Sequence, residues 1–129
     1  KQLKADQLAG SKADIILAGH CGLPFGQQIG HKAWLNAGVI GMPANEGKES
    51  VWYMLLSPID SGLEASWHRL QYDVCAAQQA MQGVGLSEQY CNALKTGLWP
   101  SLDVLPPHEQ ALSGSQLNLK PLLLRYQNN

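Results

Sequence analysis

Apolar and polar positions along the chain first follow the two-residue period of β-strands and later the 3.6-residue period of helices. The short apolar run Ile15–Ala18 is rich in β-branched residues and predicts a strand buried on both faces. Residues 32–36 predict a second short strand, and residues 50–57 a third that is apolar on both faces. We predict a turn at 58–62 and a hairpin arm over 63–72, with a β-bulge near His68 and Arg69 where the apolar parity shifts.

Helical spacing dominates the segments on either side of these strands. Residues 3–12 predict a weak helix, and apolar residues at helical spacing predict another from Val74 to Val84. Ser87 is a good N-cap for a further helix that ends near Gly97. Residues 99–129 contain four prolines and predict an extended C-terminal arm that docks on the body through Leu119 and Leu122–Leu124, with one helical turn around 109–112.

Two glycine-rich segments, 19–30 and 37–47, separate the predicted strands and are expected to be loops. An antiparallel hairpin followed by helices indicates the α+β class. The length of 129 residues is that of one modest domain. We therefore expect residues 1–129 to form a single domain, or a fragment of a longer one.

The net charge, the length of the apolar runs and the cysteine content limit which partners and which cellular compartment are expected. The formal net charge is −1, so no basic field favours a nucleic-acid partner. No apolar run is long enough to cross a membrane, and the polar start of the chain lacks the apolar core of a signal peptide. The cysteines Cys21, Cys75 and Cys91 are odd in number and lack CxxC spacing, which is typical of reduced thiols. We expect a cytoplasmic protein with no membrane partner.

The first candidate for chemistry is the loop Gly19-His20-Cys21-Gly22, directly after a buried strand. Functional residues often lie on loops at strand ends, and a glycine before the histidine allows a sharp turn that aims the imidazole. Imidazole nitrogen suits divalent transition metals. A single histidine in such a place is also compatible with a purely structural role.

The second candidate is the turn Asn36-Ala37-Gly38, which follows the next predicted strand. Glycine lets the backbone approach a ligand closely, although an Asn–Gly turn is equally explained by its conformation alone. The order in which the strands and these two loops follow one another is more informative about function than either loop alone. A strand, Gly-His, a second short strand and Asn-x-Gly resemble the closing motifs of the calcineurin-like metallophosphoesterases.

That resemblance implies the C-terminal part of a metallophosphoesterase β-sandwich flanked by helices. It implies a dinuclear centre in which two divalent cations, about 3.5–4 Å apart, activate water for attack on a phosphate mono- or diester. His20 would be a metal ligand, and Gly19, Cys21, Gly22, Asn36 and Gly38 would form the site loops. The metal would be Mn, Fe or Zn.

The chain departs from the family pattern in two ways. Gly22 stands where the motif has its second histidine, and glycine carries no donor atom. The earlier ligand motifs of the family are absent from residues 1–18. We therefore expect this chain to be the C-terminal portion of a longer phosphoesterase, inactive alone and completed by a missing N-terminal half; self-association into a homo-oligomer is a further expectation.

Two alternatives compete with this interpretation. In the first, the chain is a non-catalytic α+β module for binding or assembly with a degenerate site, which Gly22 favours. In the second, Cys21 is a thiol nucleophile with His20 or His31 as its base. The sequence offers no orienting Asn or Asp and no helix start after Cys21, so this second alternative is disfavoured.

Overall fold

The computed structural model describes residues 2–125, which contain four helices and six strands. In chain order these are α1 (Gln2–Gly10), β1 (Ile15–Ala18), β2 (Phe25–Ile29), β3 (Lys32–Asn36), β4 (Val51–Ile59), β5 (Gly62–Leu70), α2 (Val74–Gly83), α3 (Glu88–Thr96), α4 (Pro107–Ala111) and β6 (Leu122–Arg125). The α+β class is confirmed. The longest helix in this range has 10 residues, and none there is suited to crossing a membrane.

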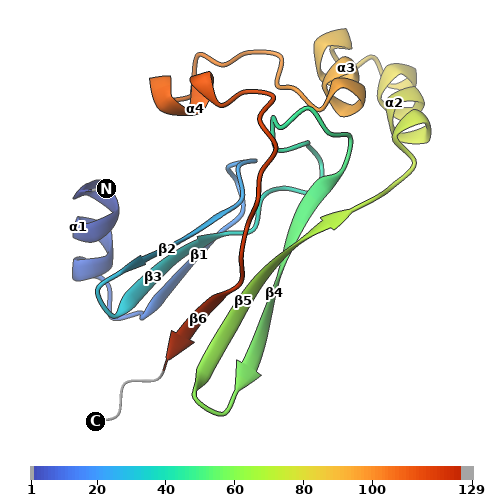
Figure 1. The fold of residues 1–129 in the computed structure, drawn as a ribbon. Helices are drawn as coiled ribbons and strands as arrows, with labels where there is room; N and C mark the ends of the chain where they lie inside the picture. The colour runs from blue at the N-terminus through green and yellow to red at the C-terminus, as the bar shows by residue number, and fades with distance from the viewer. Residues whose placement is uncertain (1, 126–129) are drawn as a thin grey trace.

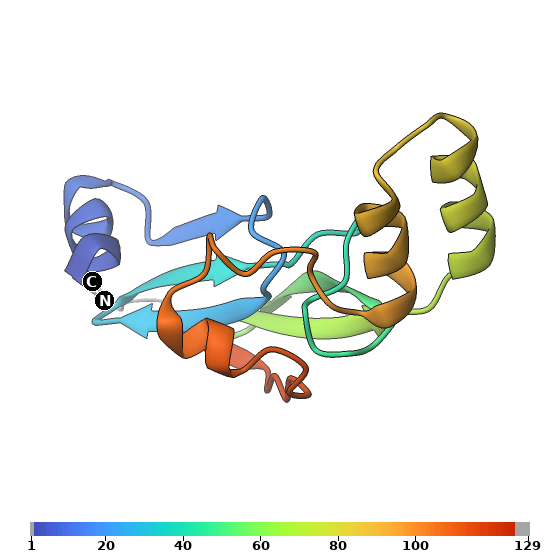
Figure 2. The same ribbon diagram turned by 90° about the horizontal axis from the view of Figure 1, so that it is seen from above.

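The strands form two separate three-stranded sheets (Figure 1). In the first sheet, of order β1-β3-β2, β1 runs parallel to β3 and β2 runs antiparallel to it. The second sheet, of order β4-β5-β6, is antiparallel throughout. Helix α1 lies beside the first sheet, whereas α2 and α3 form a hairpin at the opposite end of the molecule (Figure 2).

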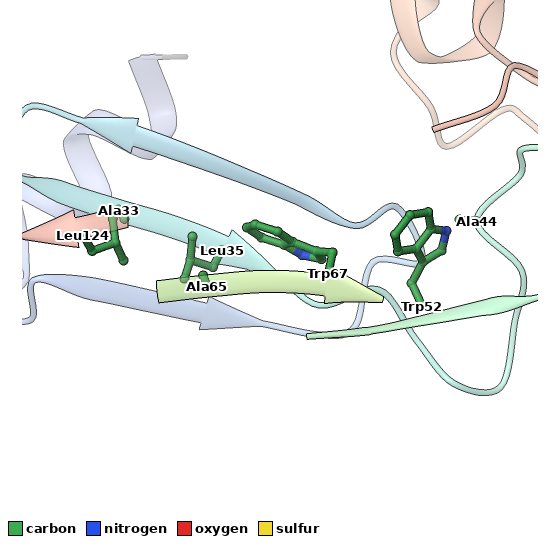
Figure 3. Close-up of a cluster of buried hydrophobic side chains, with 7 residues drawn as sticks. All are labelled: Ala33, Leu35, Ala44, Trp52, Ala65, Trp67 and Leu124. Carbon is green, nitrogen blue, oxygen red and sulfur yellow. The ribbon is translucent and has the colours of Figure 1, made fainter. Parts of the chain in front are cut away.

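The hydrophobic core draws on both sheets (Figure 3). From β3 come Ala33 and Leu35, and from β5 come Ala65 and Trp67, all of them buried. The Trp67 indole Nε1 donates a hydrogen bond of 2.8 Å to the backbone oxygen of Asn36, which links β5 directly to β3. The single side chain of Trp67 therefore supplies both apolar contact and a polar link between the sheets.

The prediction of one loop over residues 19–30 is wrong, because β2 occupies its second half and pairs with β3. Gly26 is exposed, but a Cβ there would lie 2.4 Å from Cη2 of Trp67. The space that a side chain at this position would take is thus occupied by a tryptophan from the other sheet. The strand consequently lacks the alternating apolar side chains by which it would be recognised in the sequence.

The predicted β-bulge is also absent, because β4 and β5 pair without interruption from Val51–Leu70 to Ile59–Gly62. The alternation of apolar residues along β5 breaks at this point because Arg69 lies on the same side of the strand as Trp67, where the alternation would place an apolar residue. Its guanidinium lies 4.3 Å from the ring centroid of Trp52. The prediction that β1 is buried on both faces is wrong as well, because Leu17 is 55% exposed and the other residues of β1 are only partly buried.

The predicted helices are confirmed within a few residues of their boundaries. Asp73 caps α2 by accepting a hydrogen bond from Ala76 N at 2.9 Å. Ser87 occupies the N-cap of α3, although its side chain makes no capping hydrogen bond. Gly97 ends α3 with φ of 70°, the left-handed conformation that favours glycine.

One buried carboxylate joins three parts of the chain. Glu46 is 2% exposed and accepts hydrogen bonds from Trp52 Nε1 at 2.7 Å, Arg69 Nη2 at 2.7 Å and the backbone N–H of Leu117 at 2.8 Å. Arg69 Nη2 also donates to the Leu117 oxygen at 2.9 Å. Glu46 thereby connects the loop of residues 37–47 to the second sheet and to the C-terminal segment.

The neighbouring Asn45 holds the C-terminal segment through three further hydrogen bonds. Its Oδ1 accepts hydrogen bonds from Trp99 N at 2.9 Å and from Ser113 Oγ at 3.3 Å. Its backbone oxygen accepts a bond of 2.8 Å from Gly114 N. Asn45 is buried with φ of 57°, a left-handed conformation that asparagine tolerates better than most residues. Residues 99–117 are therefore fixed to the body by polar contacts as well as apolar ones.

Replacing Glu46 tests this arrangement. Burial raises the pKa of Glu46, but hydrogen bonds from Arg69, Leu117 and Trp52, with the charge of Arg69, lower it more, so that the pKa lies below its ordinary value of 4.5. We expect Glu46→Gln to reduce the free energy of unfolding at pH 7 by about 2–3 kcal/mol, because charged hydrogen bonds are lost and Arg69 keeps no charged partner. Urea denaturation measures this.

The effect should depend on pH with a defined sign. A lowered pKa in the folded state stabilises the protein above pH 4.5 and ceases to do so as the pH falls through the folded-state pKa. The difference between wild type and Glu46→Gln should therefore shrink below pH 4.5. Glu49→Gln, at an exposed position, is the matched control. Equal losses from both variants would contradict the assignment.

Candidate functional site

The parallel pairing of β1 and β3 brings the two candidate loops to one edge of the first sheet. Ala18 is paired with Asn36 at the carboxyl ends of these strands, and Ala37 N donates a hydrogen bond of 3.0 Å to Ala18 O. The histidine loop starts directly after β1, and the asparagine turn starts directly after β3. Such an edge, where parallel strands end, is a common place for ligand sites.

Asn36 fixes the shape of the histidine loop. It is 1% exposed, and its Nδ2 donates hydrogen bonds of 2.7 Å to the backbone oxygens of both Cys21 and Leu23. Its Oδ1 is buried and has no hydrogen-bond partner among the described residues. One amide thus holds the loop, and one buried acceptor at the same place remains free for a donor.

His20 is exposed and lines a cavity of about 480 Å³. The cavity is also lined by Lys4, Ala18, Gly19, Cys21, Phe25, Trp34 and Asn36. Gly19, His20, Cys21 and Asn36 therefore lie together, as a shared site would need. The exposed thiol of Cys21 has no disulfide partner.

Gly22 and Gly38 are not among the residues that line this cavity, and both pack against tryptophan side chains. Gly38 has φ of 85°, and a Cβ there would lie 3.2 Å from Cβ of Trp52. Gly22 is buried beneath Trp99, where a Cβ would lie 2.8 Å from Cζ2 of the indole. That indole is held by a hydrogen bond of 2.7 Å from its Nε1 to the Pro43 oxygen. The position where the motif would carry a second histidine is therefore filled by Trp99.

The remaining histidines lie elsewhere. His31 and His108 are exposed, and His68 shares a hydrogen bond of 2.8 Å with Ser66 and stacks on Tyr53 at 5.4 Å between centroids. Within residues 2–125 there is no group of three or more His, Cys, Asp or Glu side chains that would hold a metal ion.

This donor set fits one part of a cation site. An exposed imidazole and a residue with an unpartnered amide oxygen line the same cavity. The set does not fit a whole dinuclear centre, since no carboxylate lines the cavity to offset the positive charge. The described residues can thus supply a ligand to such a centre but cannot form it by themselves.

Sequence reasoning missed three residues that shape this site: Lys4, Phe25 and Trp99. The Lys4 Nζ lies 3.7 Å from the Phe25 ring centroid, a cation–π contact between α1 and β2. The sequence gives no signal for a contact between elements that far apart.

The fold is similar to that of a metallophosphoesterase from Sphaerobacter thermophilus, with a TM-score of 0.65 and 19% sequence identity. The match covers 74% of this chain and 48% of that one, so this chain spans about half the length of the similar protein. No family model matches the sequence, and no curated protein matches it significantly. The likeness supports a metallophosphoesterase-like fold.

The contact between Gly22 and Trp99 can be tested by a double-mutant cycle. We expect Gly22→Ala to lower the free energy of unfolding by about 1–3 kcal/mol, because the added methyl group overlaps a ring that cannot move without losing its bond to Pro43. The loss of unfolding free energy caused by Gly22→Ala should be much smaller when Trp99→Leu is also present. Chemical denaturation of the four chains measures both values.

Gly10→Ala is the control for this cycle, because a Cβ at Gly10 has no atom within 4 Å. A cost of Gly22→Ala that is the same with and without the tryptophan would show that the ring does not close this position.

Proposed function

We propose that this chain is the C-terminal part of a metallophosphoesterase β-sandwich and contributes His20 to a divalent-cation centre that hydrolyses phosphate mono- or diesters. The other ligands would come from residues outside those described, in an N-terminal half of the same protein. Manganese, iron and zinc are the candidate metals, since imidazole accepts each of them.

The observation that carries the proposal is the meeting of His20 and Asn36 at the carboxyl ends of two parallel strands. The histidine follows β1, the asparagine ends β3, and both line one cavity. The metallophosphoesterase-like fold adds independent support.

The roles of the chain's own residues follow from their contacts. When bound, the metal ions would supply Lewis-acid activation of water and of the phosphoryl group. His20 would offer one imidazole nitrogen as a ligand. Asn36 would keep the loop in place through its bonds to Cys21 and Leu23, and Lys4 would place a positive charge beside the phosphate. Each of these tasks is binding or positioning rather than proton transfer.

A second candidate function is a non-catalytic binding or assembly module. The specific observation in its favour is the Trp99 ring over Gly22, which leaves no space for a second ligand side chain at that position. In this case the cavity would retain affinity for small anions but would not support turnover.

The two functions are distinguished by metal binding and turnover. With the longest product of the gene, we expect manganese- or zinc-dependent hydrolysis of p-nitrophenyl phosphate or its bis ester. His20→Ala should lower that turnover by at least about a hundredfold, the usual scale for loss of a group that sustains a metal centre. Bound metal should be measured in parallel by elemental analysis.

His31→Ala is the matched control, because His31 is exposed and lies outside the cavity. Only trace metal and no hydrolysis in the longest product would refute the phosphoesterase proposal and favour the binding module. Unchanged turnover in His20→Ala would remove His20 from the centre.

A further inference from the structure

We infer that a second cavity, between β2 and the C-terminal segment, receives an uncharged apolar organic group of the phosphate ester whose phosphate occupies the His20 cavity. This inference deepens the proposed function and rests on it. It assigns a substrate class, phosphate esters of aromatic or other apolar alcohols.

The second cavity has the size and the lining of a small-molecule site. Its volume is about 540 Å³, within the range of ligand pockets. Its apolar lining comes from two parts of the chain, Leu23, Pro24 and Phe25 from the first and Leu105, Pro106 and Leu112 from the second. Leu112 is 48% exposed, so this apolar surface remains accessible to solvent in the structure.

The two cavities share part of their lining. Lys4, Cys21 and Phe25 line both of them. The two cavities are therefore adjacent, and the inference places the charged end of one molecule in the His20 cavity and its apolar end in the second. A free phosphate ion would use only the His20 side, and a simple apolar molecule only the other.

Lys4 places a positive charge at the border between the two cavities. The Phe25 ring contact and a hydrogen bond of 3.4 Å to Gln27 Oε1 hold its ammonium group in place. An ammonium group carries three donors, so further donors remain for an anion. A phosphate beside Lys4 would place the esterified group toward the apolar walls.

Glu109 places a carboxylate in the lining of the second cavity. Of the two cavities it lines only the second, and among residues 2–125 no hydrogen bond or ion pair involves its carboxylate. A second negative charge on the organic group would be repelled there. This disfavours esters whose organic group carries a second phosphate, such as sugar bisphosphates, and favours neutral aromatic groups.

The test uses the full chain and three probes: 2-naphthyl phosphate, 2-naphthol and inorganic phosphate, with affinities measured by calorimetry. We expect naphthyl phosphate to bind at least about tenfold more tightly than either of the others. Leu112→Asp should weaken naphthyl phosphate and naphthol about tenfold by placing a charge in the apolar wall. Val84→Asp, at an exposed position outside both cavities, should change neither.

Lys4→Met should weaken naphthyl phosphate and leave naphthol unchanged, because only the ester carries the anion. Retained circular dichroism would show that each variant is folded. The inference is overturned if naphthyl phosphate binds no more tightly than phosphate or naphthol, or if Val84→Asp weakens it as much as Leu112→Asp. Loss of the proposed metal-dependent turnover with intact naphthyl phosphate binding would refute the proposed function and leave this cavity assigned.

Discussion

The buried carboxylate of Glu46 is the interaction on which the rest of the structure depends. It is too deeply placed to be hydrated, so its charge has to be met by protein donors, and those donors come from β4, β5 and the C-terminal segment. Together with Asn45 it sets where residues 99–117 lie. These residues then form one wall of the larger cavity and carry the indole that covers Gly22. The shape of the candidate site is therefore determined by a residue outside both of its cavities.

This dependence explains why the second sheet tolerates an arginine on its inner side. Arg69 lies over the Trp52 ring and donates to both Glu46 and the Leu117 oxygen. The pair is not fully enclosed, since the Arg69 side chain is 31% exposed against 1% for Glu46. Solvent contact at the guanidinium lowers the cost of burying the pair, while the carboxylate stays fully bonded. The network therefore fixes position at a moderate energetic cost.

Helices and strands whose apolar residues recur at a regular spacing were predictable from the sequence. Contacts between segments far apart in the chain were not. The helical period over Val74 to Val84 and the strand pattern over residues 50–57 gave the correct element type because each pattern is local. β2 was missed because it carries Gly26, where Trp67 from another sheet takes the space of a side chain. At the site, the order of two loops was enough to expect that His20 and Asn36 belong together. The filling of Gly22 by Trp99 depends on chain segments 77 residues apart, and no spacing rule reveals it.

The charges around the His20 cavity bear on how a cation could be held there. Lys4 lines the cavity and no carboxylate does, so the described residues by themselves favour an anion over a metal ion. A cation centre at His20 therefore requires acidic ligands from another part of the protein to reverse this local preference. The same positive charge is suited to a phosphate group with or without metal. Phosphate binding and metal binding at this corner are thus separable, and a protein that lost the second could retain the first.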